Sequence, residues 1–196
     1  SLSELFNNPN LDIDGITFDG NQVAQFIATF AEVSVEKLTF LNCEFKNYTQ
    51  YAICDAWEDG CHIGTLNIDN CLFHDGGSAV SIGKKGFDGK IPYDSFKMTN
   101  TTIYNISMPG YAGVINLYAL NESESEEGEV VIDHVTIYNF DAAQLGAISV
   151  RKNKNLKIKL LVLIFLQQSL CLRIAGMMLL LDLVFDQESF YRLLGI

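Results

Sequence analysis

The chain has 196 residues, a formal net charge of −11 and a hydrophobic fraction of 48%, which suits one globular domain. This acidic balance argues against a nucleic-acid partner, because such a partner would need a basic stripe. It also disfavours capture of an anionic polymer, although one basic groove could lie on an acidic body. The first residues lack the charged start and apolar core of a signal peptide, so they indicate no compartment.

Residues 1–37 are predicted to form an N-terminal lead-in or cap. Within them, residues 11–18 alternate apolar and polar side chains, which is typical of a strand with one buried face. Residues 21–35 fit either another coil or a short capping helix, since the end of a solenoid needs a cap over its unpaired edges.

A ten-residue pattern then recurs, beginning at Leu38, Leu66, Phe96 and Val130, so that successive starts are 28, 30 and 34 residues apart. This spacing is typical of solenoid coils. Positions one and three are apolar around a mostly polar residue, which predicts a strand with one buried face. The third position holds Phe40, Ile68, Met98 and Ile132; the fifth Asn42, Asn70, Asn100 and His134; the eighth Phe45, Phe73, Ile103 and Ile137; the tenth Asn47, Asp75, Asn105 and Asn139.

The fifth and tenth positions predict sharp bends, because asparagine tolerates left-handed backbone angles and bonds its own local backbone. The apolar residue at position eight is expected to point inward from the strand between these two bends. A third short strand is predicted in each coil, at residues 51–54, 78–82, 113–117 and 146–150.

One coil of this kind buries too little apolar surface alone, whereas stacked coils bury a continuous core and pair their backbones at about 4.8 Å. The predicted fold is therefore all-β: a right-handed, single-stranded parallel β-helix with about three short strands per coil, spanning residues 38–159. A β-sandwich would need Asp-Gly turns midway between paired alternating runs, and a leucine-rich horseshoe would show its leucine and asparagine consensus. The chain shows neither pattern.

The loop at residues 55–62 combines acidic side chains with the single tryptophan of the chain. Trp57 could pack on the apolar face of a sugar, while Asp55, Glu58 and Asp59 could bind calcium through their carboxylate oxygens. The alternative is a solvated turn in which Trp57 covers the edge of a coil.

The five cysteines show no metal-binding spacing. Cys43 and Cys71 occupy the same column of neighbouring coils, which predicts buried, stacked thiols. A disulfide between Cys54 and Cys61, which would close the acidic loop, is the alternative for that pair.

Basic residues gather at two places. Lys84 and Lys85 lie in the long turn at residues 83–94, and Arg151 and Lys152 follow the last of the third strands. If these turns meet along one sheet, they would form a groove for an anionic glycan.

The pattern changes from residue 160. Leu156 opens a fifth copy, but Leu160 stands where the turn asparagine is due. Polar residues interrupt the apolar run that follows, which leaves it short of the ~20 residues of a membrane helix. Residues 160–196 are therefore predicted to be an irregular or helical apolar tail that lies outside the β-helix register and promotes association. Either this tail caps the solenoid, or the reading frame slipped near Lys159.

Three copies carry a resemblance: Leu-Thr-Phe-Leu-Asn-Cys-Glu-Phe-Lys-Asn-Tyr at 38–48, Leu-Asn-Ile-Asp-Asn-Cys-Leu-Phe at 66–73 and Val-Val-Ile-Asp-His-Val-Thr-Ile-Tyr-Asn-Phe at 130–140. They resemble coils of the chondroitinase-B-like, pectate-lyase-type β-helix proteins of polysaccharide-degrading gut bacteria, over roughly residues 35–159. The resemblance implies a secreted, periplasmic or cell-surface domain that binds complex glycans without catalysis. Its alternative is a calcium-assisted polysaccharide lyase that acts by β-elimination on uronic-acid polymers.

Lyases of that family use a lysine base and an arginine acid, with calcium neutralising the uronate carboxylate. The resemblance therefore implies Lys84 and Arg151 as candidate catalytic residues, and calcium as the candidate cofactor. The expected partner is a polysaccharide or other glycan, with no nucleic acid and no transmembrane span. The candidate binding residues are Trp57, Lys84, Lys85, Arg151 and Lys152.

Overall fold

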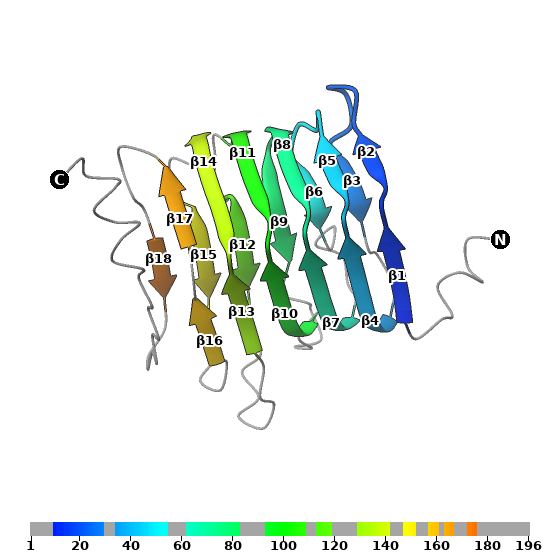
Figure 1. The fold of residues 1–196 in the computed structure, drawn as a ribbon, viewed down its shortest axis with the longest axis vertical. Coiled ribbons are helices and arrows are strands. Elements are labelled where there is room, and N and C mark those ends of the chain that lie inside the picture. The colour runs from blue at the N-terminus through cyan, green and yellow to red at the C-terminus, as the bar shows by residue number, and fades with distance from the viewer. Residues whose placement is uncertain are drawn as a thin grey trace.

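The computed structural model of the chain describes residues 10–29, 34–54, 62–82, 93–108, 113–118, 129–141, 147–151, 157–160, 163–166 and 172–175. Within these residues the fold is all-β, and every strand pair is parallel. Three six-stranded sheets run side by side along the molecule (Figure 1). Successive strands belong to successive sheets, so each coil contributes one strand to each sheet. The predicted parallel β-solenoid with three strands per coil is confirmed.

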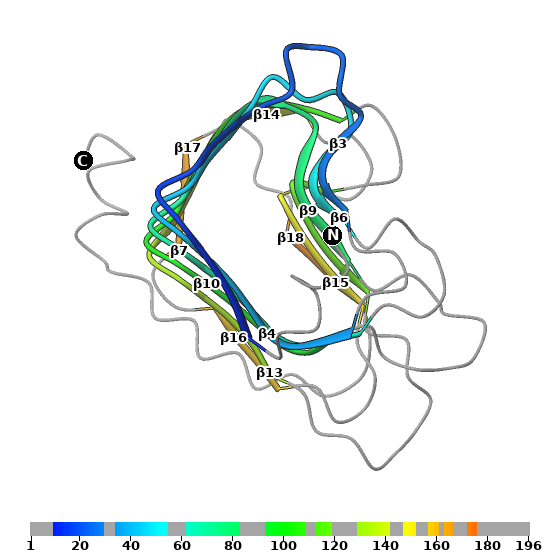
Figure 2. The ribbon, with the colours of Figure 1, turned by 90° about the vertical axis from the view of Figure 1, so that its right-hand side faces the viewer.

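We name the sheets A, B and C in the order in which a coil visits them. Sheet A contains β1 (Asn10–Asp14), β4 (Ser34–Leu41), β7 (His62–Asp69), β10 (Tyr93–Thr99), β13 (Glu129–Asp133) and β16 (Lys157–Leu160). Sheet B contains β2 (Thr17–Asp19), β5 (Glu44–Lys46), β8 (Leu72–Gly76), β11 (Thr102–Ser107), β14 (Val135–Asp141) and β17 (Leu163–Leu166). Sheet C contains β3 (Phe26–Thr29), β6 (Tyr51–Cys54), β9 (Ser78–Ile82), β12 (Ile115–Tyr118), β15 (Ile148–Arg151) and β18 (Leu172–Ala175). Figure 2 looks along the stack and shows the strands of each sheet superimposed.

The backbone bends as predicted at both asparagine columns of the repeat. In the fifth column, between sheets A and B, Asn42, Asn70, Asn100 and His134 have φ angles of 50–53°. In the tenth column, within or at the end of the sheet B strands, Asn47, Asp75, Asn105 and Asn139 have φ angles of 48–57°. These angles lie in the left-handed region, which asparagine and aspartate enter at lower cost than most residues.

The side chains of the fifth column also bond along the stack, either to one another or to the aspartate that precedes the turn in the neighbouring coil. The amide of Asn42 donates to Asp14 Oδ1 at 2.8 Å, and the amide of Asn70 donates to Asn42 Oδ1 at 2.6 Å. In the next coil the amide of Asn100 donates to Asp69 Oδ1 at 2.9 Å. The turns are therefore held both by their own backbone geometry and by side-chain contacts between coils.

The core lies inside the coil and is built from the predicted apolar columns. Phe45, Phe73, Ile103 and Ile137 are fully buried and pair in register along sheet B. The ring of Phe45 stacks on that of Phe73, with centroids 4.6 Å apart and planes within 2°, and on that of Phe18 at 4.8 Å. The inner positions of sheet A, such as Leu38 and Phe40, are likewise fully buried.

The first coil starts earlier than the sequence pattern alone indicates. β1, β2 and β3 pair with β4, β5 and β6, so residues 10–29 form a coil rather than a capping helix. Gly15, with φ of 69°, occupies the turn position that Asn42 holds in the next coil. A further coil was one of the two alternatives for residues 21–35, and the ten-residue pattern does not show it because a glycine replaces the turn asparagine.

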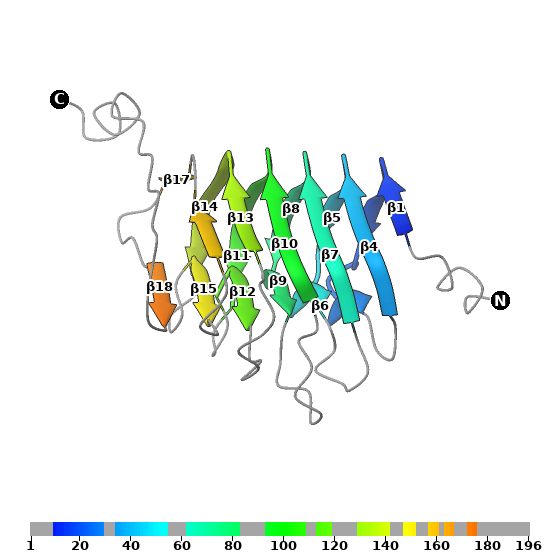
Figure 3. The same ribbon diagram turned by 90° about the horizontal axis from the view of Figure 1, so that it is seen from below.

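The last coil corrects the prediction for the tail. β16, β17 and β18 pair with β13, β14 and β15, so the register continues through Ala175 and the expectation of a tail outside it from residue 160 is wrong (Figures 1 and 3). Val130 pairs with Ile158, two residues later than a copy starting at Leu156 would require. Strand pairing uses backbone groups, and an apolar side chain fills a core column whether or not a turn asparagine follows. The interpretation of a frame slip assumed that the coil register is lost from residue 160, whereas strand pairing continues to Ala175. Residues 176–196 lie outside the described residues.

Candidate functional site

Most of the residues that the sequence predicted for a site lie outside the described residues. This applies to Asp55, Trp57, Glu58, Asp59, Lys84, Lys85 and Lys152. Arg151 is the last residue of β15 and pairs through its backbone with Tyr118 and Ala175, which places it in sheet C. The calcium site and the basic groove therefore stay predictions.

The outer side of sheet B carries a different set of functional side chains. Along β5 the burial alternates, with Phe45 fully buried and Glu44 and Lys46 partly exposed. In-register pairing continues this outer row from Asp19 and Lys46 through His74 and Tyr104 to Tyr138. These residues occupy the ninth position of the repeat, next to the turn asparagines. Strand pairing thus places side chains separated by about thirty residues next to one another.

Three rings of this row form a continuous stack. The imidazole of His74 and the phenol of Tyr104 have centroids 4.9 Å apart and planes within 1°. The rings of Tyr104 and Tyr138 are 5.1 Å apart and within 6°. Parallel rings at such separations are offset, so each ring leaves part of its face uncovered. Tyr104 and Tyr138 are partly exposed, which makes the stack a row of aromatic surface on the outside of the solenoid.

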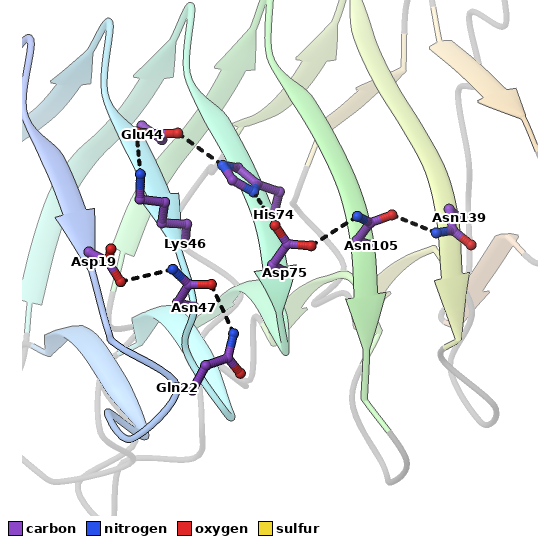
Figure 4. Close-up of polar contacts among 9 residues, drawn as sticks. All are labelled: Asp19, Gln22, Glu44, Lys46, Asn47, His74, Asp75, Asn105 and Asn139. Carbon is purple, nitrogen blue, oxygen red and sulfur yellow. Dashed lines mark hydrogen bonds and ion pairs between the residues drawn. The ribbon is translucent and has the colours of Figure 1, made fainter.

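His74 also joins two carboxylates from different coils. Its Nδ1 lies 2.7 Å from Asp75 Oδ2, and its Nε2 lies 3.0 Å from Glu44 Oε1 (Figure 4). The second oxygen of Glu44 accepts from Lys46 Nζ at 3.4 Å. The imidazole is largely covered, with 11% of the side chain exposed, whereas Asp75 is 44% exposed. Glu44 thus contacts His74 and Lys46, Asp75 contacts His74 and Asn105, and both carboxylates remain partly exposed to solvent.

These contacts keep the carboxylates ionised. The hydrogen bond from His74 lowers the pKa of Glu44 below its ordinary value, with Thr17 and Lys46 as lesser causes. The hydrogen bonds from His74 and then Asn105 lower the pKa of Asp75. Burial, reinforced by the charge of Asp75, raises the pKa of Tyr104, so its hydroxyl stays a neutral hydrogen-bond donor.

A row of amides borders the ring stack at the tenth position of the repeat. Asn105 donates to Asp75 Oδ1 at 2.9 Å, and Asn139 donates to Asn105 Oδ1 in the following coil (Figure 4). At the other end of the row, Asn47 donates to Asp19 Oδ1 at 3.0 Å and accepts from Gln22. We call the outer row from Asp19 and Lys46 through the ring stack, the Glu44–His74–Asp75 cluster and these amides the sheet B face.

The cysteines do not add a reactive group to this face. Cys43 and Cys71 are buried in adjacent coils, and their thiols donate to backbone carbonyls, as the prediction of stacked core thiols requires. Burial raises the pKa of Cys71 to about 12, which keeps it a thiol at neutral pH. Cys54 is buried, but Cys61 lies outside the described residues, so a disulfide between them stays a prediction.

In the part of the chain that the structure describes, no cluster of three or more His, Cys, Asp or Glu side chains could hold a metal ion. The same part has no helix with the length and apolar character needed to cross a membrane.

Comparison with protein-family models, with curated protein sequences and with solved structures finds no match for this chain. The strand pairing establishes the chain as a parallel β-solenoid. Its resemblance to the chondroitinase-B-like family stays a prediction.

The sheet B face was not predicted, although one signal for it is visible in the sequence. The ninth position of the repeat reads Lys46, His74, Tyr104 and Tyr138, directly before the turn asparagines. An outward column with aromatic rings in successive coils predicts a surface row once the register is known. The pairing of Glu44 with His74 had no such signal, because it joins two different columns.

Proposed function

We propose that the protein binds glycans through the sheet B face and that it does so without catalysis. The observation that carries the proposal is the stack of His74, Tyr104 and Tyr138 beside the amides of Asn105 and Asn139. Sugars present apolar C–H faces and polar hydroxyls in alternation, so they need apolar ring surface and hydrogen-bonding groups close together.

The dimensions of the face favour an extended ligand over a compact one. The three rings belong to three successive coils, so two coil steps of about 4.8 Å give a row about 10 Å long. In-register pairing and the contacts of His74 connect the row to the charged cluster at Glu44 and Asp75. A polysaccharide lying along the stack would contact several rings with successive sugar units.

The ionisation of the cluster supports binding over hydrolysis. A carboxylic acid that donates a proton to a leaving sugar needs a raised pKa. The pKa values of Glu44 and Asp75 are both lowered by His74, so neither is prepared for that role. Ionised carboxylates instead accept hydrogen bonds from sugar hydroxyls. The alternative of a calcium-assisted lyase depends on Lys84, Arg151 and the acidic loop, whose side chains the structure does not describe.

With this role goes a proposed location outside the cytoplasm, in the periplasm, at the cell surface or secreted. This location is part of the proposal and rests on where complex polysaccharides occur.

The test is binding to a panel of polysaccharides, measured by affinity electrophoresis and by calorimetry. Tyr104→Ala and Tyr138→Ala should each weaken binding by about tenfold, the equivalent of about 1.4 kcal/mol. Tyr104→Phe, which keeps the ring, should retain most of the affinity. Phe26→Ala is the matched control, because it removes a ring stacked on Tyr51 in sheet C. Equal affinities for Tyr104→Ala and the unmodified protein would refute the proposal.

A further inference from the structure

The charges of the sheet B face bear on which glycans it accepts. Among its described residues the basic side chains are Lys46 and His74, and each already contacts a carboxylate. The face also carries Asp19, Glu44 and Asp75, whose pKa values are all lowered. The three carboxylates therefore outnumber the two basic side chains, and both basic side chains already contact a carboxylate.

The connections next to this face add no positive charge. The sequences that join sheet B to sheet C in the coils of the ring stack are residues 77, 108–114 and 142–147, and none contains Lys or Arg. The lysines at 84 and 85 belong to the sequence between β9 and β10, which joins sheet C to sheet A. Lys152 belongs to the corresponding sequence between β15 and β16. Lys84, Lys85 and Lys152 thus belong to different connections from those that leave the ring stack.

We infer that the sheet B face selects uncharged, hydroxyl-rich glycans and discriminates against uronic-acid and sulfated polymers. This inference rests on the proposed function and gives its ligand a chemical class. Hydroxyls of a neutral sugar donate to the open lone pairs of Glu44 and Asp75, and they both donate to and accept from the amides of Asn105 and Asn139. A uronate would bring a carboxylate next to Glu44 and Asp75 with no unengaged cation on the face to neutralise it.

The sharpest test uses ligands that differ only in charge. Native polygalacturonate and native alginate are each compared with their carboxyl-reduced, neutral forms of matched chain length, together with neutral glucans and mannans. For each polymer, the affinity of the unmodified protein is compared with that of Tyr104→Ala. The difference between the two measures binding at this face. The neutral form of a pair should bind at least about tenfold more tightly than the native form, as expected for a like-charge contact of about 1.4 kcal/mol.

The dependence of the affinity on ionic strength is a second measurement, and the direction of its change is predicted. Raising the ionic strength should strengthen residual Tyr104-dependent binding of a native uronate polymer, because it screens repulsion, and should leave neutral polymers unchanged. Glu44→Gln should reduce the preference for the neutral form several-fold. Glu36→Gln removes the same charge from an exposed position on sheet A and should leave that preference unchanged.

The outcomes separate the inference from the function on which it rests. Tyr104-dependent binding that is equal or tighter for the native polymers, and weakened by salt, would overturn the inference while leaving glycan binding intact. If no polymer of either kind shows Tyr104-dependent binding, the proposed function fails and the inference fails with it.

Discussion

The imidazole Nε2 of His74 lies 3.0 Å from Oε1 of Glu44, although the two residues are thirty positions apart. The contact joins β8 to β5, and the other ring nitrogen of His74 joins Asp75 at 2.7 Å. One side chain thereby connects two coils, stacks on Tyr104 in a third and holds two carboxylates ionised. The stability of the solenoid and the chemistry of its surface therefore depend on the same residue.

The contacts of His74 with Glu44 and Asp75, here called the His74 bridge, should make the stability of the protein depend on pH. The pKa values of Glu44 and Asp75 are lower in the folded protein than their ordinary values of 4.5 and 3.8. Their contribution is therefore fully present above those ordinary values and is lost as the pH falls through the folded values. His74→Phe keeps a ring on Tyr104 but removes both hydrogen bonds. The difference in melting temperature between the unmodified protein and His74→Phe should be largest near about pH 6 and shrink below about pH 4.

Thermal unfolding between about pH 3 and pH 6 measures this difference. Glu36→Gln, which removes an exposed carboxylate on sheet A that takes no part in these contacts, serves as the control and should show no such change with pH. A difference that grows toward acid pH would contradict the assignment of the bridge.

The core prediction concerns Phe73, which is fully buried and stacked on Phe45. Phe73→Ala should lower the free energy of unfolding by about 3–5 kcal/mol, because it leaves a cavity between two coils. Urea denaturation measures this loss. Val23→Ala, at a side chain that is 76% exposed, should change stability by less than about 0.5 kcal/mol. Similar losses in both variants would refute the buried column.

The turn prediction concerns Asn70, whose φ is 51°. Asn70→Ala should cost about 1–2 kcal/mol, because alanine is strained in the left-handed region and the contact with Asn42 is lost. Asn70→Gly loses the same contact but adopts this backbone without strain, so it should cost clearly less. Urea denaturation of both variants separates backbone strain from the side-chain bond. Equal losses would show that the side-chain contact alone matters.

The last coil gives a prediction about truncation. A chain ending at Lys159 lacks β17 and β18, whereas a chain ending at Ala175 retains them. In a solenoid each coil stabilises its neighbour, so the shorter chain should melt at a lower temperature. Scanning calorimetry of the two chains measures the difference. Identical melting temperatures would mean that the sixth strand of sheets B and C adds nothing to the fold.

Much of the fold was predictable from the sequence, because the repeated residues have backbone and side-chain preferences that act locally. Asn42 and Asn47 mark left-handed bends, since few other residues adopt that backbone readily. Phe45 and Phe73 mark the core, because the alternation of a strand places them on one face. These properties depend on each residue and its nearest neighbours, so the sequence by itself determined the strands, the bends and the stacking in coils.

The tertiary structure decided the two ends and the surface. Backbone pairing extends to β1 and to β18 although Gly15 and an apolar segment replace the expected asparagines, because hydrogen bonds between strands do not depend on side-chain identity. It also decided that Glu44 meets His74, and that Arg151 belongs to sheet C while the ring stack belongs to sheet B. Glu44 and His74 are thirty positions apart and lie in different columns of the repeat, so their contact forms only when the coils stack in this register.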